Sequence, residues 1–286
     1  MYIIIFNMKL YTINTGNFKL DGGAMFGVVP KSLWSRTNPA DENNLCSWAM
    51  RSLLVETDDK LIIIDNGIGE KQDHNFLKHY HLHGEDSLEK SLKKNGFSVD
   101  DVTDVFLTHL HFDHCGGSVK WNNEKTDFEL TFKNANYWSN KKHWEWAKNP
   151  NSREKASFLK ENIIPIEKSG KIKFVEKEGD LFHNFSTFFV NGHTESQMIP
   201  KIKHNDQTIV FMADLLPSIG HIPLPYVMGY DIRPLITLKE KYLFLKEAAE
   251  KEFILFLEHD YNNECCTVKM TEKGVRLKSV FSLNEI

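Results

Sequence analysis

The sequence predicts an α/β fold, and three observations indicate it. Apolar segments with the residue types of buried strands recur along the chain, among them residues 102–108, 185–190, 207–212 and 253–257. Each of these segments is followed by a short polar turn that contains a His or an Asp. Helical segments occur as well, such as residues 87–94, which begin at a capping Ser87 and stop before Gly96. Functional side chains in α/β sheets collect at the carboxyl ends of strands, so these polar turns are where we expect a site.

Length and composition describe an ordinary globular protein. The chain has 286 residues, of which 41% are hydrophobic and 26% charged, which is enough apolar material for a sizeable core. No stretch has the composition of a linker, so we expect a single domain over residues 1–286. A net charge of -4 argues against a nucleic-acid partner, and we expect a small-molecule substrate. The sequence leaves the oligomeric state open, and a homodimer is compatible with it.

The cysteines and the N-terminus bear on the compartment. Cys46, Cys115, Cys265 and Cys266 show no C-x-x-C spacing, so a disulfide framework is not expected and a reducing, cytoplasmic compartment fits better. No apolar run approaches the ~18 residues of a membrane span, so we expect no membrane partner. The apolar start at residues 1–8 is too short for a secretory signal. It is either a first strand or lies just upstream of a true start at Met8.

Near the N-terminus, residues 9–15 alternate as a strand that Gly16 is expected to break, and a glycine-rich bend covers residues 21–30. The bend is not a phosphate loop, because no strand–GxxxxGK[ST]–helix arrangement is present. Met25, Phe26 and Trp34 have two interpretations. They either form one wall of an apolar substrate pocket or pack beneath the sheet, and our hypothesis is the substrate wall.

Residues 47–57 and 60–65 predict a β-hairpin joined by Asp58-Asp59. The hairpin ends in the loop Asp65-Asn66-Gly67, which has the composition of an Asx turn. A polar stretch with several histidines, at positions 74, 79, 81 and 83, follows. On a helix, the side chains of His79, His81 and His83 would point in different directions rather than to one site, so we interpret these histidines as solvated or structural.

The most informative stretch is residues 108–117, which lie between a predicted strand and two glycines. Four potential metal ligands, His109, His111, Asp113 and His114, occur there in the pattern His-x-His-x-Asp-His. Imidazole nitrogens and a carboxylate suit Zn²⁺ or a similar first-row metal. A turn with this spacing can direct two side chains at one ion and the next two at a second. Three His and an Asp rarely coincide in this way by chance, which argues against a merely polar loop.

The second half of the chain repeats the arrangement of a strand followed by a ligand. The predicted strands 185–190, 207–212 and 253–257 are followed by His193, Asp214 and His259. A lone His after a strand is more often structural, so the argument depends on three such ends occurring together with the motif. Between the two halves, residues 121–133 are expected to be extended, and residues 139–147 and 152–162 to be helical.

This ordered set of residues resembles the signature of the metallo-β-lactamase superfamily of dinuclear metallohydrolases, and the resemblance covers nearly the whole chain. It implies a four-layer αβ/βα sandwich with two divalent metal ions at one edge, which we expect to be Zn²⁺. The first ion would be held by His109, His111 and His193, the second by Asp113, His114 and His259, and Asp214 would bridge the two.

The resemblance also implies a mechanism. A water shared by the two ions would be deprotonated near neutral pH and act as the nucleophile. Asp113 would be catalytic as well as a ligand, because it could help carry a proton to the leaving group. In the superfamily an Asp at the position of Asp65 supports the metal loop by hydrogen bonding.

The sequence departs from the family in two places. The family often has Gly-His-Thr-Pro-Gly-His where residues 192–197 here end in Gln197. Gln197 replaces the second His of that motif and can still make hydrogen bonds near the ligands. Well-known lactonases of the superfamily place a Tyr shortly after the bridging Asp, and none stands there in this chain. Tyr226 or Tyr230 could serve instead, and we assign Tyr226 to substrate binding. Cys115 is expected to be a small buried packing residue.

Residues 20–34 and 212–231 resemble the branch that contains N-acyl-homoserine lactonases and organophosphate hydrolases. We therefore expect a dinuclear metal-dependent hydrolase that opens the lactone ring of N-acyl homoserine lactones, which is quorum quenching. Two alternatives stay open, an organophosphate or arylester hydrolase and a glyoxalase II-type thioesterase. The acidic balance disfavours a nuclease of the superfamily, and the complete ligand set disfavours a non-enzymatic binding module.

Overall fold

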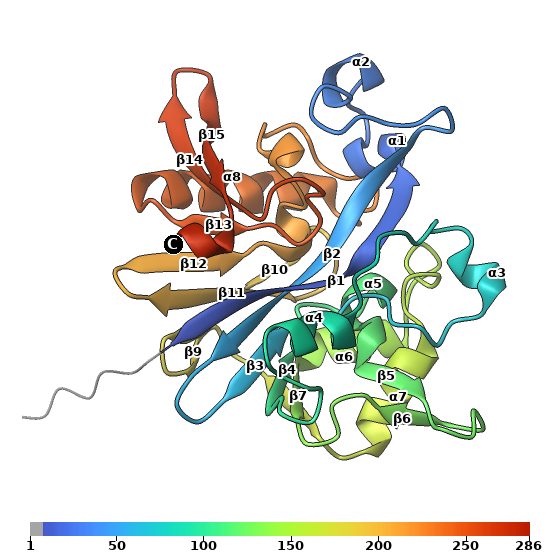
Figure 1. The fold of residues 1–286 in the computed structure, drawn as a ribbon. Coiled ribbons are helices and arrows are strands. Elements are labelled where there is room, and N and C mark those ends of the chain that lie inside the picture. The colour runs from blue at the N-terminus through green and yellow to red at the C-terminus, as the bar shows by residue number, and fades with distance from the viewer. Residues whose placement is uncertain (1–7) are drawn as a thin grey trace, which may run out of the picture.

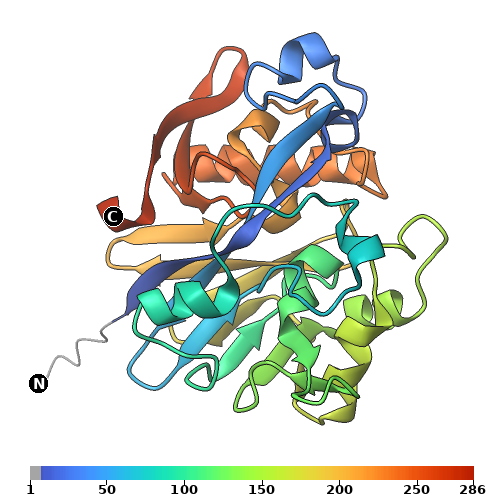
Figure 2. The ribbon, with the colours of Figure 1, turned by 45° about the vertical axis from the view of Figure 1, so that its right-hand side comes forward.

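The computed structural model describes residues 8–286. The segment upstream of Met8, and with it the question of where the chain starts, lies outside the described residues. Two β-sheets pack face to face, and helices cover their outer faces (Figures 1 and 2). The predicted four-layer αβ/βα sandwich is therefore confirmed.

The first sheet has the strand order β1-β2-β3-β4-β7-β8. β1, β2 and β3 are antiparallel neighbours, whereas β3, β4, β7 and β8 run parallel. Parallel strands bring their carboxyl ends to one edge, and the loop after β4 carries the metal motif. The strands are β1 (Lys9–Asp21), β2 (Leu45–Glu56), β3 (Leu61–Ile64), β4 (Asp104–Phe106), β7 (Asn136–Asn140) and β8 (Ile172–Val175), and the helices on its outer face are α4 (Leu88–Lys94), α6 (Lys141–Lys148) and α7 (Lys160–Lys168).

The second sheet has the order β15-β14-β13-β12-β11-β10-β9, and α8 (Pro234–Glu250) packs on its outer side. Its one parallel pair is β12 with β13, so the residues just beyond these two strands meet at the same edge. The strands are β9 (Gly179–Phe182), β10 (Phe185–Val190), β11 (Gln197–His204), β12 (Gln207–Phe211), β13 (Ile254–Phe256), β14 (Cys265–Thr271) and β15 (Gly274–Phe281).

Shorter elements complete the chain. The hairpin of β5 and β6 forms a separate two-stranded sheet within the described residues. No helix in residues 8–286 is long and apolar enough to cross a membrane. The short elements are β5 (Val119–Trp121), β6 (Phe128–Leu130), α1 (Gly22–Phe26), α2 (Lys31–Trp34), α3 (His74–Leu77), α5 (Phe112–Cys115) and the 3₁₀ turns Gly116–Ser118, Ala213–Leu215, Ile219–His221 and Leu283–Glu285.

Alternating side chains of the central strands build two separate cores. In β3, Ile62 and Ile64 belong to the core between the two sheets. Leu61 and Ile63 point the other way, into the core beneath α4, α6 and α7. Both faces of this strand are therefore buried, which explains its continuous run of apolar residues.

The structure corrects two predicted boundaries. β1 does not end at Gly16 but continues to Asp21, with a register shift at the glycine, whose φ of 118° suits a residue without Cβ. Residues 152–157 are turns rather than the start of a helix, and α7 begins at Lys160. The hairpin of β2 and β3 is confirmed, and the side chain of Ser87 caps α4 as predicted.

Candidate metal centre

Seven buried polar side chains meet where the two sheets come together, in the segments that follow β4, β10, β12 and β13. None of the seven residues exposes more than 9% of its surface. Buried polar groups need a partner that replaces water, so the polar atoms of this cluster must bind each other or a ligand such as a metal ion. The seven are the predicted ligands His109, His111, Asp113, His114, His193, Asp214 and His259.

Three imidazoles and one carboxylate form a first group. Nδ1 of His111 lies 3.1 Å from Nε2 of His109 and 3.1 Å from Nε2 of His193. Oδ2 of Asp214 lies 3.0 Å from Nε2 of His193 and 3.9 Å from Nε2 of His109. Ligand atoms around a tetrahedral ion with bonds of about 2.0–2.1 Å are about 3.3 Å apart. The four atoms therefore have separations close to those of a tetrahedral ligand set.

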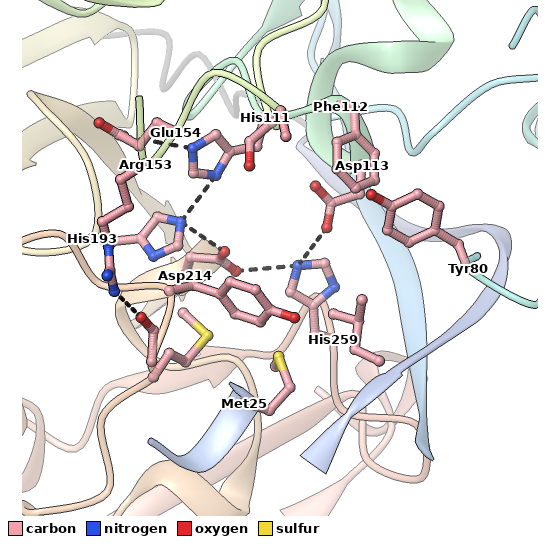
Figure 3. A pocket seen from close by; sticks show the side chains of 16 residues that line it. Met25, Tyr80, His111, Phe112, Asp113, Arg153, Glu154, His193, Asp214 and His259 are labelled. Carbon is pink, nitrogen blue, oxygen red and sulfur yellow. Dashed lines mark hydrogen bonds and ion pairs between the residues drawn. The ribbon is translucent and has the colours of Figure 1, made fainter. Parts of the chain in front are cut away.

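Asp113, His114 and His259 form a second group. Nε2 of His259 lies 3.1 Å from Nε2 of His114, and Oδ2 of Asp113 lies 3.8 Å from each of these nitrogens. The second oxygen of Asp214, Oδ1, lies 3.1 Å from Nε2 of His259 and 3.6 Å from Nε2 of His114. Figure 3 shows Asp214 between His193 and His259, with one oxygen toward each group.

The outer nitrogens of His193 and His259 face hydrogen-bond acceptors. Nδ1 of His193 lies 3.0 Å from Oδ1 of Asp231, and Nδ1 of His259 lies 2.8 Å from the carbonyl oxygen of Ala49. A neutral imidazole carries one N–H, and these acceptors hold it on the outer nitrogen. In the neutral form of these rings the inner nitrogens present lone pairs to the two groups, which is the state that a metal ligand needs. Against the effect of burial, the charge of Asp214 raises the pKa of His193 to about 10 and that of His259 to about 9, so a metal ion would displace a proton from each ring.

Asp65 supports the metal loop as expected. Its Oδ2 lies 3.0 Å from Nδ1 of His114 and accepts the hydroxyl proton of Thr108 at 2.6 Å, while Oδ1 accepts the backbone N–H of Thr108 at 2.8 Å. Glu258 also reaches Nδ1 of His114, at 3.0 Å. Burial raises the pKa of Glu258, while the positive charge of a protonated His114 ring acts to lower it.

The electrostatics of the centre favour cations. Burial alone would lower the pKa of His114, but the charges of Glu258, Asp113 and Asp214 raise it well above its ordinary value. Burial and the neighbouring imidazoles hold the pKa of His109 well below its ordinary value. The carboxylates thus stabilise positive charge here, while His109 stays in the neutral form that binds metal.

The residues fit divalent metal ions by their own chemistry. Within each of the two groups, the ligand atoms all lie within 4.8 Å of one another. Oδ1 of Asp214 is buried and accepts no hydrogen bond from the residues that the structure describes, although ring nitrogens surround it. Imidazole nitrogens combined with carboxylate oxygens are the donor set of Zn²⁺ and related ions.

A cavity of about 390 Å³ opens onto the centre. Its polar end contains Asp113, Asp214 and the rings of three ligand histidines, and its remaining walls are largely apolar (Figure 3). Cavities of this character bind small molecules that have one polar and one apolar part. The apolar and aromatic wall residues are Leu20, Met25, Tyr80, Phe112, Ala156, Met228 and Tyr230.

The structure corrects most of the predicted substrate wall. Met25 lines the cavity, but Phe26 and Trp34 are 0% and 1% exposed and stack on one another at 5.3 Å in the core under α1 and α2. The physical reason is that neighbouring residues of a helix point about 100° apart, so α1 can turn only one of Met25 and Phe26 to the cavity. Tyr226 packs edge-on against Phe26, and Tyr230 lines the cavity in its place.

Other sequence expectations have mixed outcomes. Cys115 is fully buried, as predicted, and the histidines at 79 and 81 are exposed and belong to neither ligand group. Gln197 can hydrogen-bond near the ligands by its chemistry. Its side chain is buried, but neither amide atom has a hydrogen-bond partner within residues 8–286.

Two carboxylates that hold ligands were missed in the sequence. Asp231 lies in an irregular segment and shows no pattern that would have singled it out. Glu154 lies in the turns before α7, accepts hydrogen bonds from Oγ1 of Thr194 at 2.6 Å and Nε1 of Trp146 at 2.8 Å, and faces Nε2 of His111 at 3.8 Å. Burial would raise the pKa of Glu154, but His111 and the hydrogen bonds from Thr194 and Trp146 lower it to about 2.

Known proteins resemble this chain over nearly its whole length. A probable metal-dependent hydrolase from Staphylococcus aureus superposes with a TM-score of 0.87 at 28% identity and covers 98% of both chains. AidC, a dizinc quorum-quenching lactonase solved with a product, gives a TM-score of 0.77 at 26% identity and covers 98% of this chain and 97% of its own. An N-acyl homoserine lactonase of Bacillus cereus is 24% identical over 270 residues, which are 90% of this chain and 94% of the relative.

The fold, the ligand groups and these relatives together define a metal-dependent hydrolase. The family model of the Metallo-beta-lactamase superfamily matches residues 51–259, from β2 to the last ligand. The chain therefore belongs to the metallo-β-lactamase superfamily.

Proposed function

We propose that this protein is a dinuclear lactonase that opens the lactone ring of N-acyl homoserine lactones and so acts in quorum quenching. The observation that carries the proposal is Asp214, which offers one oxygen to each ligand group at the polar end of a largely apolar cavity. The relatives named as such lactonases support the substrate, and the dizinc AidC supports the metal. We also propose that residues 1–286 form one hydrolase domain.

In this proposal the chain binds two Zn²⁺ ions. The first would be held by His109, His111 and His193, the second by Asp113, His114 and His259, and Asp214 would join both. When bound, the ions would supply Lewis acidity for the substrate carbonyl and would lower the pKa of a water molecule toward ~7.

Asp113 is the proposed proton carrier. Lactone opening joins the oxygen of water to the carbonyl carbon and breaks the bond from that carbon to the ring oxygen, which leaves as a hydroxyl after taking a proton. Asp113 lines the cavity, and its Oδ2 lies 3.8 Å from the rings of His114 and His259. Its carboxylate can therefore take a proton from water and pass it to the departing oxygen.

The walls of the cavity supply binding and orientation. The acyl chain would lie against Leu20, Met25 and Met228. Tyr80 and Tyr230 also line the cavity, and burial raises the pKa of Tyr80 to about 12, so its hydroxyl stays protonated at neutral pH. A protonated phenol can donate a hydrogen bond to an amide or ester oxygen of the substrate.

Charge disfavours a glutathione thioester. Among the described residues that line the cavity, Arg153 is the single Lys or Arg, and its guanidinium already donates to the carbonyl oxygens of Gly229 and Asp231. Glutathione brings two carboxylates, which would need cationic partners. An uncharged arylester or organophosphate meets no such obstacle, so it stays the second candidate.

The experiment combines metal analysis with a substrate panel on one sample purified without chelator. We expect about two divalent ions per chain and hydrolysis of N-acyl homoserine lactones well above that of aryl esters, organophosphates and a glutathione thioester. Activity confined to the aryl esters or organophosphates would move the assignment to the second candidate. A metal content near zero after resupply would reject the dinuclear mechanism itself.

A further inference from the structure

His143 of α6 links the two loops that carry the ligands of the first group. Its Nε2 accepts a hydrogen bond from the backbone N–H of Leu110 at 2.8 Å, and its Nδ1 lies 2.6 Å from the carbonyl oxygen of Glu195. Leu110 stands between the first two histidines of the metal motif, and Glu195 follows His193 by two positions. One imidazole thus spans from the motif loop of the first sheet to the loop after β10 of the second.

Both nitrogens of this ring are fully used. A carbonyl oxygen can only accept, so Nδ1 of His143 carries the proton, and Nε2 keeps the lone pair that receives the N–H of Leu110. The side chain is 0% exposed, and burial lowers its pKa to about 3, so the ring stays neutral. His143 belongs to neither ligand group and has no free nitrogen for a metal.

We propose that His143 is a positioning residue for the first metal ion, and the inference rests on the proposed dinuclear centre. The inner nitrogens of His111 and His193 approach to 3.1 Å although they come from different sheets. The contacts of His143 are to backbone atoms, so the ring fixes the separation of the two loops rather than the rotamer of one ligand. Without it, the ligand atoms of the first group would no longer be held at a common distance from one ion.

The second group has its own supports, so the effect should be selective. His114 is held directly by Asp65, whose Oδ2 lies 3.0 Å from Nδ1 of the His114 ring. The loop that carries His259 is held to β2, because Ala49 exchanges hydrogen bonds with its backbone and its ring. Neither support involves His143.

The test compares three variants by metal titration. His143→Phe keeps a buried planar ring but removes both hydrogen bonds. His143→Gln restores an amide that can accept from Leu110. His221→Phe is the matched control, because His221 is also buried, with a pKa lowered by burial to about 3. Its two hydrogen bonds, at 2.9 Å each, go to Ser218 and to the carbonyl of Met25, and neither partner is a metal ligand.

We expect the metal-free forms of the two Phe variants to lose comparable thermal stability, and only His143→Phe to lose metal affinity. Competition with a chelator should show one ion bound ~10–100-fold more weakly, with a changed Co²⁺ absorption spectrum and partial recovery in His143→Gln. If His143→Phe does not fold, the same titration is made on His143→Asn, which cannot reach Leu110. Wild-type affinity for both ions and an unchanged Co²⁺ spectrum in the folded variant would overturn the inference. A wild-type protein that binds no metal would instead reject the proposed function.

Discussion

Oδ1 of Asp231 lies 3.0 Å from Nδ1 of His193, across 38 positions of the chain. The other oxygen of Asp231 accepts the backbone N–H of Met228 at 3.2 Å, so the carboxylate is held in place and in turn holds the ring. Without this acceptor the imidazole can turn and carry its proton on the inner nitrogen. We expect Asp231→Ala to weaken metal binding ~10–100-fold, and Asp231→Asn to weaken it less, because the amide oxygen can still accept. Chelator competition measures both, and wild-type affinity in Asp231→Ala would contradict the assignment.

Met25 and Phe26 are neighbours with different environments, which gives a pair of contrasting variants. Phe26 is fully buried and stacks on Trp34 at 5.3 Å and on His221 at 4.4 Å, so Phe26→Ala should cost about 3–5 kcal/mol of folding free energy. Met25→Ala should raise KM for long-chain lactones more than for short-chain ones, because Met25 lines the cavity. Denaturant unfolding and a series of acyl-chain lengths separate the two effects. A chain-length effect in Phe26→Ala with unchanged stability would restore the original substrate-wall hypothesis for Phe26.

The ligands could be predicted because their signal is local. His109, His111, Asp113 and His114 stand within six residues, and each later ligand follows a strand whose composition marks it. Apart from Asp65, which the family resemblance implied, the groups that hold the rings could not be predicted, since their partners are distant in the chain. Asp231 lies 38 positions from His193, and His143 bonds a carbonyl 52 positions away. Such contacts exist only once the sheets have packed.

The unpredicted strand β11 shows a second limit. It contains Pro200, which cannot donate to a ladder and usually argues against an internal strand. In the structure Pro200 pairs with Thr187 of β10, and the pairing with β12 begins only at Lys201. Pro200 therefore lies where the strand has a hydrogen-bonding neighbour on one side only. Its position depends on the register of β11 with both β10 and β12, which the sequence of β11 alone does not show.

Lys241 of α8 predicts a pH-dependent stability. Its Nζ donates to the carbonyl oxygens of His221, Pro223 and Tyr226 at 3.0, 3.2 and 2.6 Å, and burial lowers its pKa from 10.5 to about 7. Between these two values the unfolded chain binds a proton that the folded chain lacks, so the contribution of this group to stability rises with pH. The contribution of Lys241 changes by at most about 1.4 kcal/mol per pH unit. This slope falls to zero below the pKa of the folded state.

The comparison for Lys241 is Lys241→Met, which has no titrating group at this position. The unfolding free energy of the wild type minus that of the variant should therefore rise with pH from about 7 toward 10.5. Denaturant titrations at several pH values measure it. A constant difference would mean that the three carbonyls hold the ammonium form at its ordinary pKa.

Asp214→Asn tests the residue on which the two-ion centre depends most. In the wild type, the two oxygens of Asp214 lie 3.0 Å from Nε2 of His193 and 3.1 Å from Nε2 of His259, one oxygen for each ligand group. The substitution keeps the shape of the side chain but removes its charge and leaves a single oxygen for both groups. We expect the variant to fold, to lose metal from one or both sites, and to lower kcat at least ~100-fold, which is about 2.7 kcal/mol of transition-state stabilisation.

The control for Asp214→Asn must change the same charge without touching a support of the centre. Asp260 is unsuitable, because it is buried and accepts hydrogen bonds from Ile219, Asn262 and Asn263. Asp206→Asn is better matched, since Asp206 is exposed in the turn that opens β12, the strand that leads to Asp214. Both variants should unfold near the wild-type midpoint when metal-free, while only Asp214→Asn loses metal and rate. Near-normal metal content and kcat in Asp214→Asn would show that the ions are joined by other groups.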